Sequence, residues 1–228
     1  MTSIEGPVTI GNVIDHLLKR PGRLIRAFID GTAGVNLILI LSGMASLVVF
    51  GLLLGTFSGS VQLWAAPLKV TGGTLAAVLI CLPSLYIFSA LGGVHGKLSN
   101  VMSMLFAAIA LTGLLLLGFA PVLWVFSQST ESVPFVGFLA LAFWLISLIF
   151  GLRLLIAATH LQGMLSPGYI KVWMSIFVVV TLQMSTALRP IIGTADSFLP
   201  KEKRFFLQHW LAEIDTADSK TTIRKPAQ

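Results

Sequence analysis

The sequence predicts an all-α fold: a polytopic membrane helix bundle of about five transmembrane helices, preceded by an interfacial amphipathic helix. Three observations predict this class. Hydrophobic residues make up 56% of the 228 residues and charged residues only 11%, less than half of the roughly 25% in a typical soluble domain. The charges gather at the two ends, because residues 35–187 hold four Lys or Arg and one acid, Glu131. The same middle section contains apolar runs long enough to cross a bilayer.

We therefore divide the chain into three parts. Residues 1–34 form a basic amphipathic segment, residues 35–193 a five-helix transmembrane domain, and residues 194–228 a polar basic tail. The expected location is a membrane, crossed several times.

The first element is an amphipathic helix over residues 9–29. Its apolar residues recur at i, i+3, i+4 and i+7, which places them on one face: Ile10, Val13, Ile14, Leu17, Leu18, Leu24, Ile25 and Phe28. The opposite face carries Asp15, His16 and the basic residues Lys19, Arg20, Arg23 and Arg26. Pro21-Gly22 is expected to kink or split the helix. A basic face opposite an apolar one is typical of a helix in the membrane interface, bound to anionic headgroups; packing on a partner or on the protein's own loops is the alternative.

Five apolar stretches of about 19–24 residues follow, each long enough at 1.5 Å per residue to cross a hydrocarbon core of about 30 Å. They are Val35–Phe57, Val70–Leu91, Val101–Trp124, Phe135–Leu155 and Ile170–Leu188. The fourth is the weakest, because Arg153 interrupts it before residues 154–159. The connections between them are too short for an extramembrane domain.

The basic residues favour a cytoplasmic N-terminus. That side then holds Lys19, Arg20, Arg23, Arg26, Lys97, Arg153 and Lys171. The other side holds Lys69 and the near part of the tail, with Arg189, Lys201, Lys203 and Arg204.

Composition also limits the function. The net charge of +6 resides at the ends of a membrane domain, so no nucleic-acid partner is expected. Cys81 is the only cysteine, the four histidines are dispersed, and Glu131 is the only carboxylate between Asp30 and Asp196. Acid–base catalysis and metal binding need such groups in proximity, so we expect no enzyme, no metal site and no cofactor.

Two polar residues within the predicted spans are candidates for an interaction. Arg153 is expected to extend its side chain to the headgroups; the alternative is a buried cation that pairs with helix carbonyls or a lipid phosphate. Gln183 lies in the fifth span, where a buried amide normally forms hydrogen bonds between helices.

Small residues form a second group of candidates. Gly51, Gly55 and Gly59 make two overlapping GxxxG steps on one face of the first span. Such faces allow two helix backbones to approach closely. Pro83 and Pro121 lie in the second and third spans, where kinks are expected.

Two segments of the chain resemble segments of known membrane-protein families. Residues 17–21, Leu-Leu-Lys-Arg-Pro, resemble the entry to the Yip1-like family of five-span membrane proteins. Residues 183–193 read QMSTALRPIIG and are similar to a QMxxxLRPxxG segment of uncharacterised bacterial multispan proteins, some described as Yip1-like. The resemblance implies a bacterial inner-membrane location. The DLYGP-type motif of eukaryotic Yip1 proteins is not present, so no vesicle-trafficking role is implied.

The second of these segments ends the fifth span. Pro190 disfavours helix at the preceding residue, so the span is expected to end at Leu188 or Arg189. Arg189 would then lie beside the last helix carbonyls, where a cation is favourable, and its guanidinium could bind a phosphate. Gly193 is expected to matter mainly if the turn there needs a positive φ.

Two functions are compatible with these sequence features. The first is a non-enzymatic scaffold or assembly subunit that packs through its glycine faces against itself or another membrane protein. The second is a channel or permease component for a neutral or anionic solute, supported by Arg153, Arg189 and the proline kinks. A lipid-modifying enzyme is a remote third.

Overall fold

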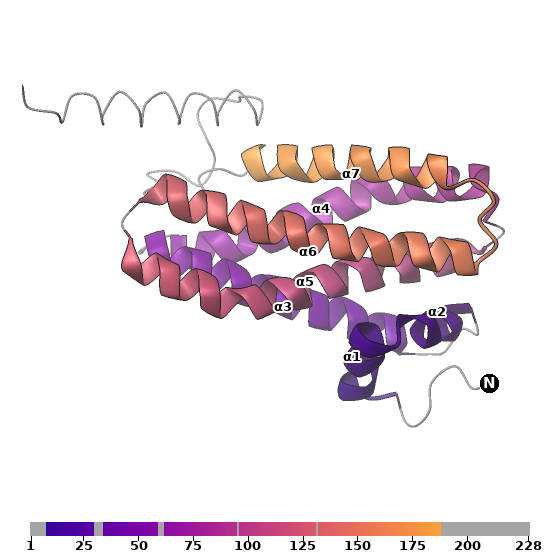
Figure 1. Ribbon diagram of the computed structural model, residues 1–228, viewed down its shortest axis with the longest axis horizontal. Coiled ribbons are helices and arrows are strands. Elements are labelled where there is room, and N and C mark those ends of the chain that lie inside the picture. The colour runs from indigo at the N-terminus through magenta and orange to yellow at the C-terminus, as the bar shows by residue number, and fades with distance from the viewer. Residues whose placement is uncertain (1–7, 30–33, 59–61, 95, 131, 188–228) are drawn as a thin grey trace, which may run out of the picture.

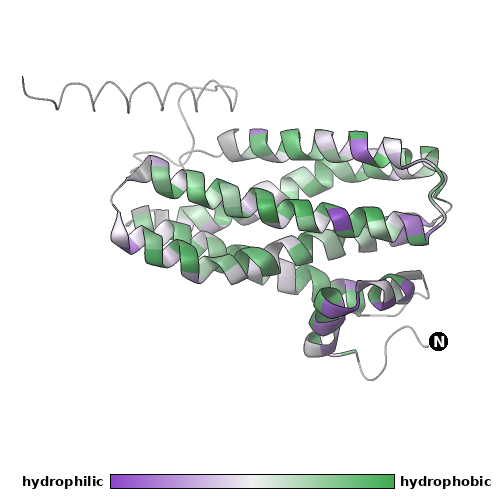
Figure 2. Cartoon of the chain, in the orientation of Figure 1, coloured by the Kyte–Doolittle hydropathy of each residue, from purple (hydrophilic) through white to green (hydrophobic). Residues whose placement is uncertain are grey.

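The computed structural model describes residues 8–29, 34–58, 62–94, 96–130 and 132–187. Within these ranges the chain forms helices and no strand, which confirms the predicted all-α class. The helices are α1 (Ile10–Lys19), α2 (Pro21–Ile29), α3 (Val35–Ser58), α4 (Gln62–Leu91), α5 (Leu98–Ser129), α6 (Val133–Leu161) and α7 (Pro167–Ala187). The last five are long and apolar enough to cross a membrane, as the green helices of Figure 2 show. The protein is therefore a multi-pass integral membrane protein.

The five long helices lie side by side, but not in chain order (Figure 1). α3 packs between α4 and α5, α6 packs on α5, and α7 packs on α4. The spatial order is thus α7–α4–α3–α5–α6. The last helix packs on α4 and makes few contacts with α6, which precedes it in the chain.

α1 and α2 lie across one end of this bundle, where they contact α3, α5 and α6. The long helices alternate in direction, so the turns at residues 92–97 and 162–166 lie at the same end. We name it the basic end, after the cations described below. The opposite, distal end holds the connections that follow α3 and α5.

The break between α1 and α2 occurs at the predicted place. Thr9 precedes α1, and its hydroxyl accepts a hydrogen bond from the backbone N–H of Asn12 at 3.5 Å. α1 ends at Lys19, Arg20 adopts a φ of −140°, and Pro21 begins α2. Proline is well suited to a first helical position, because its missing N–H would have no partner there.

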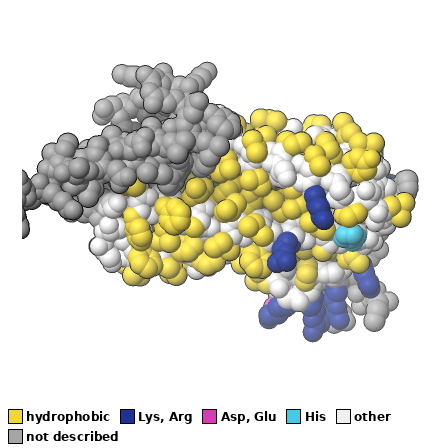
Figure 3. Space-filling model, turned by 45° about the horizontal axis from the view of Figure 1, so that its top comes forward, with side chains coloured by type: hydrophobic (Ala, Val, Ile, Leu, Met, Phe, Trp, Pro, Cys, Tyr) yellow, Lys and Arg dark blue, Asp and Glu magenta, His cyan; other side chains and the backbone are white. Residues whose placement is uncertain are grey.

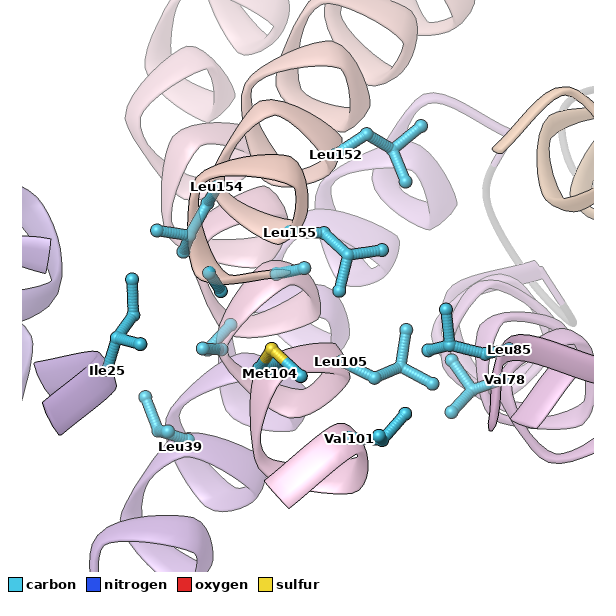
Figure 4. Packing of buried hydrophobic residues seen from close by; sticks show 14 of the residues in the cluster. Ile25, Leu39, Val78, Leu85, Val101, Met104, Leu105, Leu152, Leu154 and Leu155 are labelled. Atoms are coloured by element: carbon cyan, nitrogen blue, oxygen red, sulfur yellow. The ribbon is translucent and has the colours of Figure 1, made fainter. Parts of the chain in front are cut away.

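The interior consists of two apolar clusters. The first fills the basic half and receives residues from all seven helices; Figure 4 shows Ile25 of α2 and Leu39 of α3 close to Met104 of α5 and Leu154 of α6. The second fills the distal half and draws on only α3, α4, α5 and α6, with Phe50, Leu116 and Val136 among its members.

Three expectations were wrong. α4 begins at Gln62 rather than at residue 70, so Lys69 belongs to a helix and is buried, not in a loop. The helix extends because Ala65 and Ala66 bury against the bundle there, and membrane helices tolerate a proline such as Pro67. α6 also continues through Arg153 to Leu161 without interruption. His16 is buried rather than on the polar face of α1.

Candidate functional site

The described cations concentrate at one end of the molecule. Seven of the eight lie at or near the basic end: Lys19, Arg20, Arg23, Arg26, Lys97, Arg153 and Lys171. The eighth, Lys69, lies in the distal half. Figure 3 shows the dark blue Lys and Arg side chains gathered toward this end, with an extensive yellow apolar surface beyond them.

Asp15 is the only carboxylate among the described residues, and it forms an ion pair with Lys19 one turn later on α1. The hydrogen bond from the Lys19 ammonium lowers the pKa of the Asp15 carboxyl. Asp15 is therefore ionised at neutral pH and offsets one of the cations. Among the described residues, the remaining cations give the basic end a net positive charge.

α1 and α2 hold the four basic residues predicted to face the membrane surface. Their apolar stripe packs on the bundle through Val13, Leu17, Leu24 and Ile25, each at most 2% exposed. Lys19, Arg20 and Arg26 are exposed, whereas Arg23 is partly buried. Ile10 and Leu18 also remain exposed on α1. The pair thus has a face fixed to the protein and a face that combines cations with apolar side chains.

The two turns at the basic end are hydrogen-bonded to each other. The carbonyl of Gly92, just after α4, accepts from the backbone N–H groups of Leu165 at 2.9 Å and Ser166 at 3.1 Å. Gly93 has a φ of +92°, which favours glycine, and the side chain of Leu165 packs against it. Nearby, the Gln162 amide nitrogen contacts the Met104 sulfur at 3.1 Å. These contacts fix the turn before α5 to the turn before α7.

Trp173 joins α7 to α4 in the basic half. It is fully buried, and its indole Nε1–H lies 3.2 Å from the Cys81 carbonyl oxygen and 3.1 Å from the Ser84 hydroxyl oxygen, both on α4. Its ring stacks on Phe177 with centroids 5.1 Å apart. Trp173 was not among the residues predicted from the sequence. A tryptophan within an apolar span was the available signal, because a buried indole normally requires an acceptor.

The glycine contacts are also made inside the chain. A Cβ on Gly51 would overlap the backbone of Pro67 on α4, so these two helices touch without intervening side chains. Gly55 is buried on the same helix, and Gly59 lies outside the described residues. Close approaches that the sequence analysis missed occur at Gly113, against Gly43 of α3, and at Gly151, against Ala108 and Thr112 of α5. Isolated glycines within apolar helices were the signal for them.

Arg153 and Gln183, the two polar residues predicted to form interactions within the spans, do not lie together. Arg153 is exposed on α6 toward the basic end. Gln183 lies sixteen residues into α7, roughly 24 Å along the helix. Its Oε1 atom is buried without a hydrogen-bond partner in the described structure. The expected bond between helices is thus not seen for that atom. Arg189, Pro190 and Gly193 lie outside the described residues.

Many hydroxyl groups in the bundle bond to their own helix. Ser46, Ser103, Thr112 and Thr181 each donate to the carbonyl four residues earlier, at 2.8–2.9 Å. Among the residues that the structure covers, no three His, Cys, Asp or Glu side chains gather as a metal site would require. What the arrangement can do chemically is attract and hold anions at the basic end.

The fold and this charge distribution define a multi-pass membrane protein with one strongly basic end. No family model matches the chain, and neither does a curated protein or a solved structure.

Proposed function

We propose that the protein is a non-enzymatic scaffold or assembly subunit of a membrane complex, and that its basic end is the surface it presents. The observation that carries this proposal is the docking of α1 and α2 across the bundle end, with Lys19, Arg20 and Arg26 exposed. A scaffold needs a surface of fixed shape and charge. Here the burial of Val13 and Leu24 fixes the two helices to the bundle.

The packing of the bundle supports the same proposal. α3 and α4 are in backbone contact at Gly51, and α5 and α6 at Gly151. Close backbone contacts resist relative movement, because a packed interface has few alternative arrangements. A bundle held in this way suits a platform better than a gate.

The proposed partners follow from charge. Anionic lipid headgroups would bind α1 and α2, with each basic residue near the surface contributing about 1 kcal/mol. The complex would also contain another membrane protein or a second copy of this chain. Because Gly51 is used within the chain, such a partner would pack on other exposed helix faces. The resemblance of residues 183–193 to a segment of bacterial multispan proteins supports a bacterial inner-membrane location.

A channel or permease component for a neutral or anionic solute is the second candidate. Two observations favour it: Lys69 is buried within α4, and the Oε1 atom of Gln183 is buried on α7. Since α7 packs on α4, both belong to the same helix pair. Polar groups inside a membrane domain often mark a solute path.

Affinity purification in a mild detergent, followed by mass spectrometry, tests the proposal. We expect wild-type protein to recover a membrane partner in fixed stoichiometry. A variant with Lys19→Gln, Arg20→Gln and Arg26→Gln should lose it. The matched control carries Gln128→Ala, Ser129→Ala and Ser132→Ala, three exposed residues at the distal end, and should retain it. Recovery of a single isolated chain that conducts a solute across liposomes would contradict the scaffold and support the permease.

A further inference from the structure

The last two helices, α6 and α7, follow each other in the chain but pack on different helices. α6 packs on α5 while α7 packs on α4, and the two make few contacts with each other. They are joined by the turn at residues 162–166, which the Gly92 carbonyl fixes from the α4 side. Near this turn, α6 and α7 therefore present neighbouring faces that the rest of the described chain does not cover.

Each of these faces carries one exposed cation. Arg153 lies on α6 among the exposed apolar residues Ile146, Ile149 and Phe150. Lys171 lies on α7 beside the exposed Val172, and Ile176 and Val179 continue that exposed surface. Neither cation forms an ion pair within the described structure, in which the single salt bridge joins Lys19 to Asp15 on α1.

Both cations lie near the same end of the bundle. Arg153 precedes the end of α6 by eight residues and Lys171 follows the start of α7 by four, so they lie about 12 Å and 6 Å from the connecting turn. α6 has 29 residues and is roughly 44 Å long, which exceeds the hydrocarbon core of about 30 Å by roughly 7 Å at each end. Arginine and lysine both extend their charge along a flexible stem toward the headgroups. Both charges thus reach the phosphate layer.

We propose that Arg153 and Lys171 form a binding site for the headgroup of an anionic phospholipid, whose acyl chains lie along the exposed apolar faces of α6 and α7. Charge complementarity identifies this occupant. Two exposed cations near one turn, without a carboxylate in the described residues around them, attract an anion, and the exposed apolar residues beneath them favour one that carries hydrocarbon. The guanidinium of Arg153 binds two phosphate oxygens at once, and the ammonium of Lys171 adds a second charge. This site is separate from the α1–α2 surface and does not depend on the scaffold function.

Native mass spectrometry of the full chain in mild detergent, titrated with phosphatidylglycerol or phosphatidylcholine, tests the site. We expect wild-type protein to retain phosphatidylglycerol preferentially. The double variant Arg153→Gln/Lys171→Gln should weaken this binding roughly tenfold or more. Arg153→Gln alone should also lower it, whereas the charge-matched control Lys97→Gln removes one exposed cation of the basic end outside both proposed lipid surfaces and should keep most of it. Thermal melting of each variant verifies folding, and Lys171→Arg, which keeps the charge, should bind like the wild type.

Three results would overturn the proposal. Equal losses in Arg153→Gln and its charge-matched control Lys97→Gln would indicate only a general positive surface. Equal retention of phosphatidylcholine and phosphatidylglycerol would mean that the cations merely extend into the headgroup layer. Displacement of the lipid by millimolar inorganic phosphate alone would show that the ligand is a free anion instead of a lipid.

Discussion

The basic and distal halves of the bundle are held together by different contacts. In the basic half, helices are joined by hydrogen bonds, such as those from Trp173 to α4 and from the 165–166 backbone to Gly92. In the distal half, α3 meets α4 at Gly51 without intervening side chains. Lipid is as apolar as the helix surfaces, so apolar burial alone favours association little. The basic half combines polar bonds with close backbone approach, as at Gly151 against Ala108, whereas the distal half shows close backbone approach at Gly51.

The largest effect that this comparison predicts is at Trp173. Trp173→Ala should lower the free energy of unfolding by about 3–5 kcal/mol, since it removes a buried ring and leaves a cavity between α4 and α7. Trp173→Phe should cost about 0.5–1.5 kcal/mol for the lost hydrogen bonds. Thermal unfolding in detergent measures both. Trp64→Ala is the control, because Trp64 is 77% exposed, and an equally large loss there would contradict the role given to Trp173.

The distal half provides the next test. Gly51→Ala should destabilise the protein by about 1–3 kcal/mol, because the added methyl group overlaps Pro67 and forces α3 and α4 apart. Gly118→Ala on α5 should be neutral or stabilising, since nothing lies within 4 Å of its Cβ position and alanine favours helix by about 1 kcal/mol. The melting temperatures of the two variants, measured in parallel, test whether the close approach at Gly51 stabilises the distal half. Similar shifts for both would mean that close approach at Gly51 does not hold the distal half.

A smaller effect is expected at the start of α1. Thr9→Ala removes the side-chain acceptor for Asn12 N–H and should cost about 1 kcal/mol of local helix stability. Hydrogen exchange should rise in α1, while α3–α7 remain protected. Thr9→Ser retains the hydroxyl and is the control. Faster exchange throughout the basic half would show that α1 is integral to that half rather than attached to it.

The smallest effect is expected for the surface ion pair. Asp15→Asn should shift the melting temperature very little, because exposed ion pairs contribute little to stability. The size of this shift depends on pH: the folded pKa of Asp15 is lowered, so the stabilisation is present above the ordinary pKa of aspartate and is lost as pH falls through the lowered value. Melting curves of wild type and Asp15→Asn should therefore converge in acid. A difference that grows on acidification would contradict this sign.

The main elements were predictable because they follow from periodicity and length. The 3.6-residue pattern located α1 and α2, and the apolar runs located five spans. The start of α4 was not predictable in the same way. Pro67 and Lys69 are common loop residues, and only their burial against neighbouring helices makes that segment helical.

The candidate site was predictable in its charge but not in its contacts. Counting cations placed Lys97, Arg153 and Lys171 on the same side as α1 and α2, and the described structure places them toward the same end. The pairing of Trp173 with Ser84 spans 89 residues of sequence, and no local pattern encodes it. The separation of α6 from α7 likewise follows from which helix α7 packs on, which a single sequence does not specify.

The return of α7 to α4 has a consequence for synthesis. A chain made from its N-terminus inserts α3, α4, α5 and α6 before α7 exists. The first four can associate as they emerge, because each contacts a helix already inserted. The face of α4 around Cys81 and Ser84 must then stay in contact with lipid until the last helix arrives, about ninety residues later. At roughly 5–20 residues per second that interval lasts several seconds or more. During this time the α7-binding face of α4 is exposed in the nascent chain.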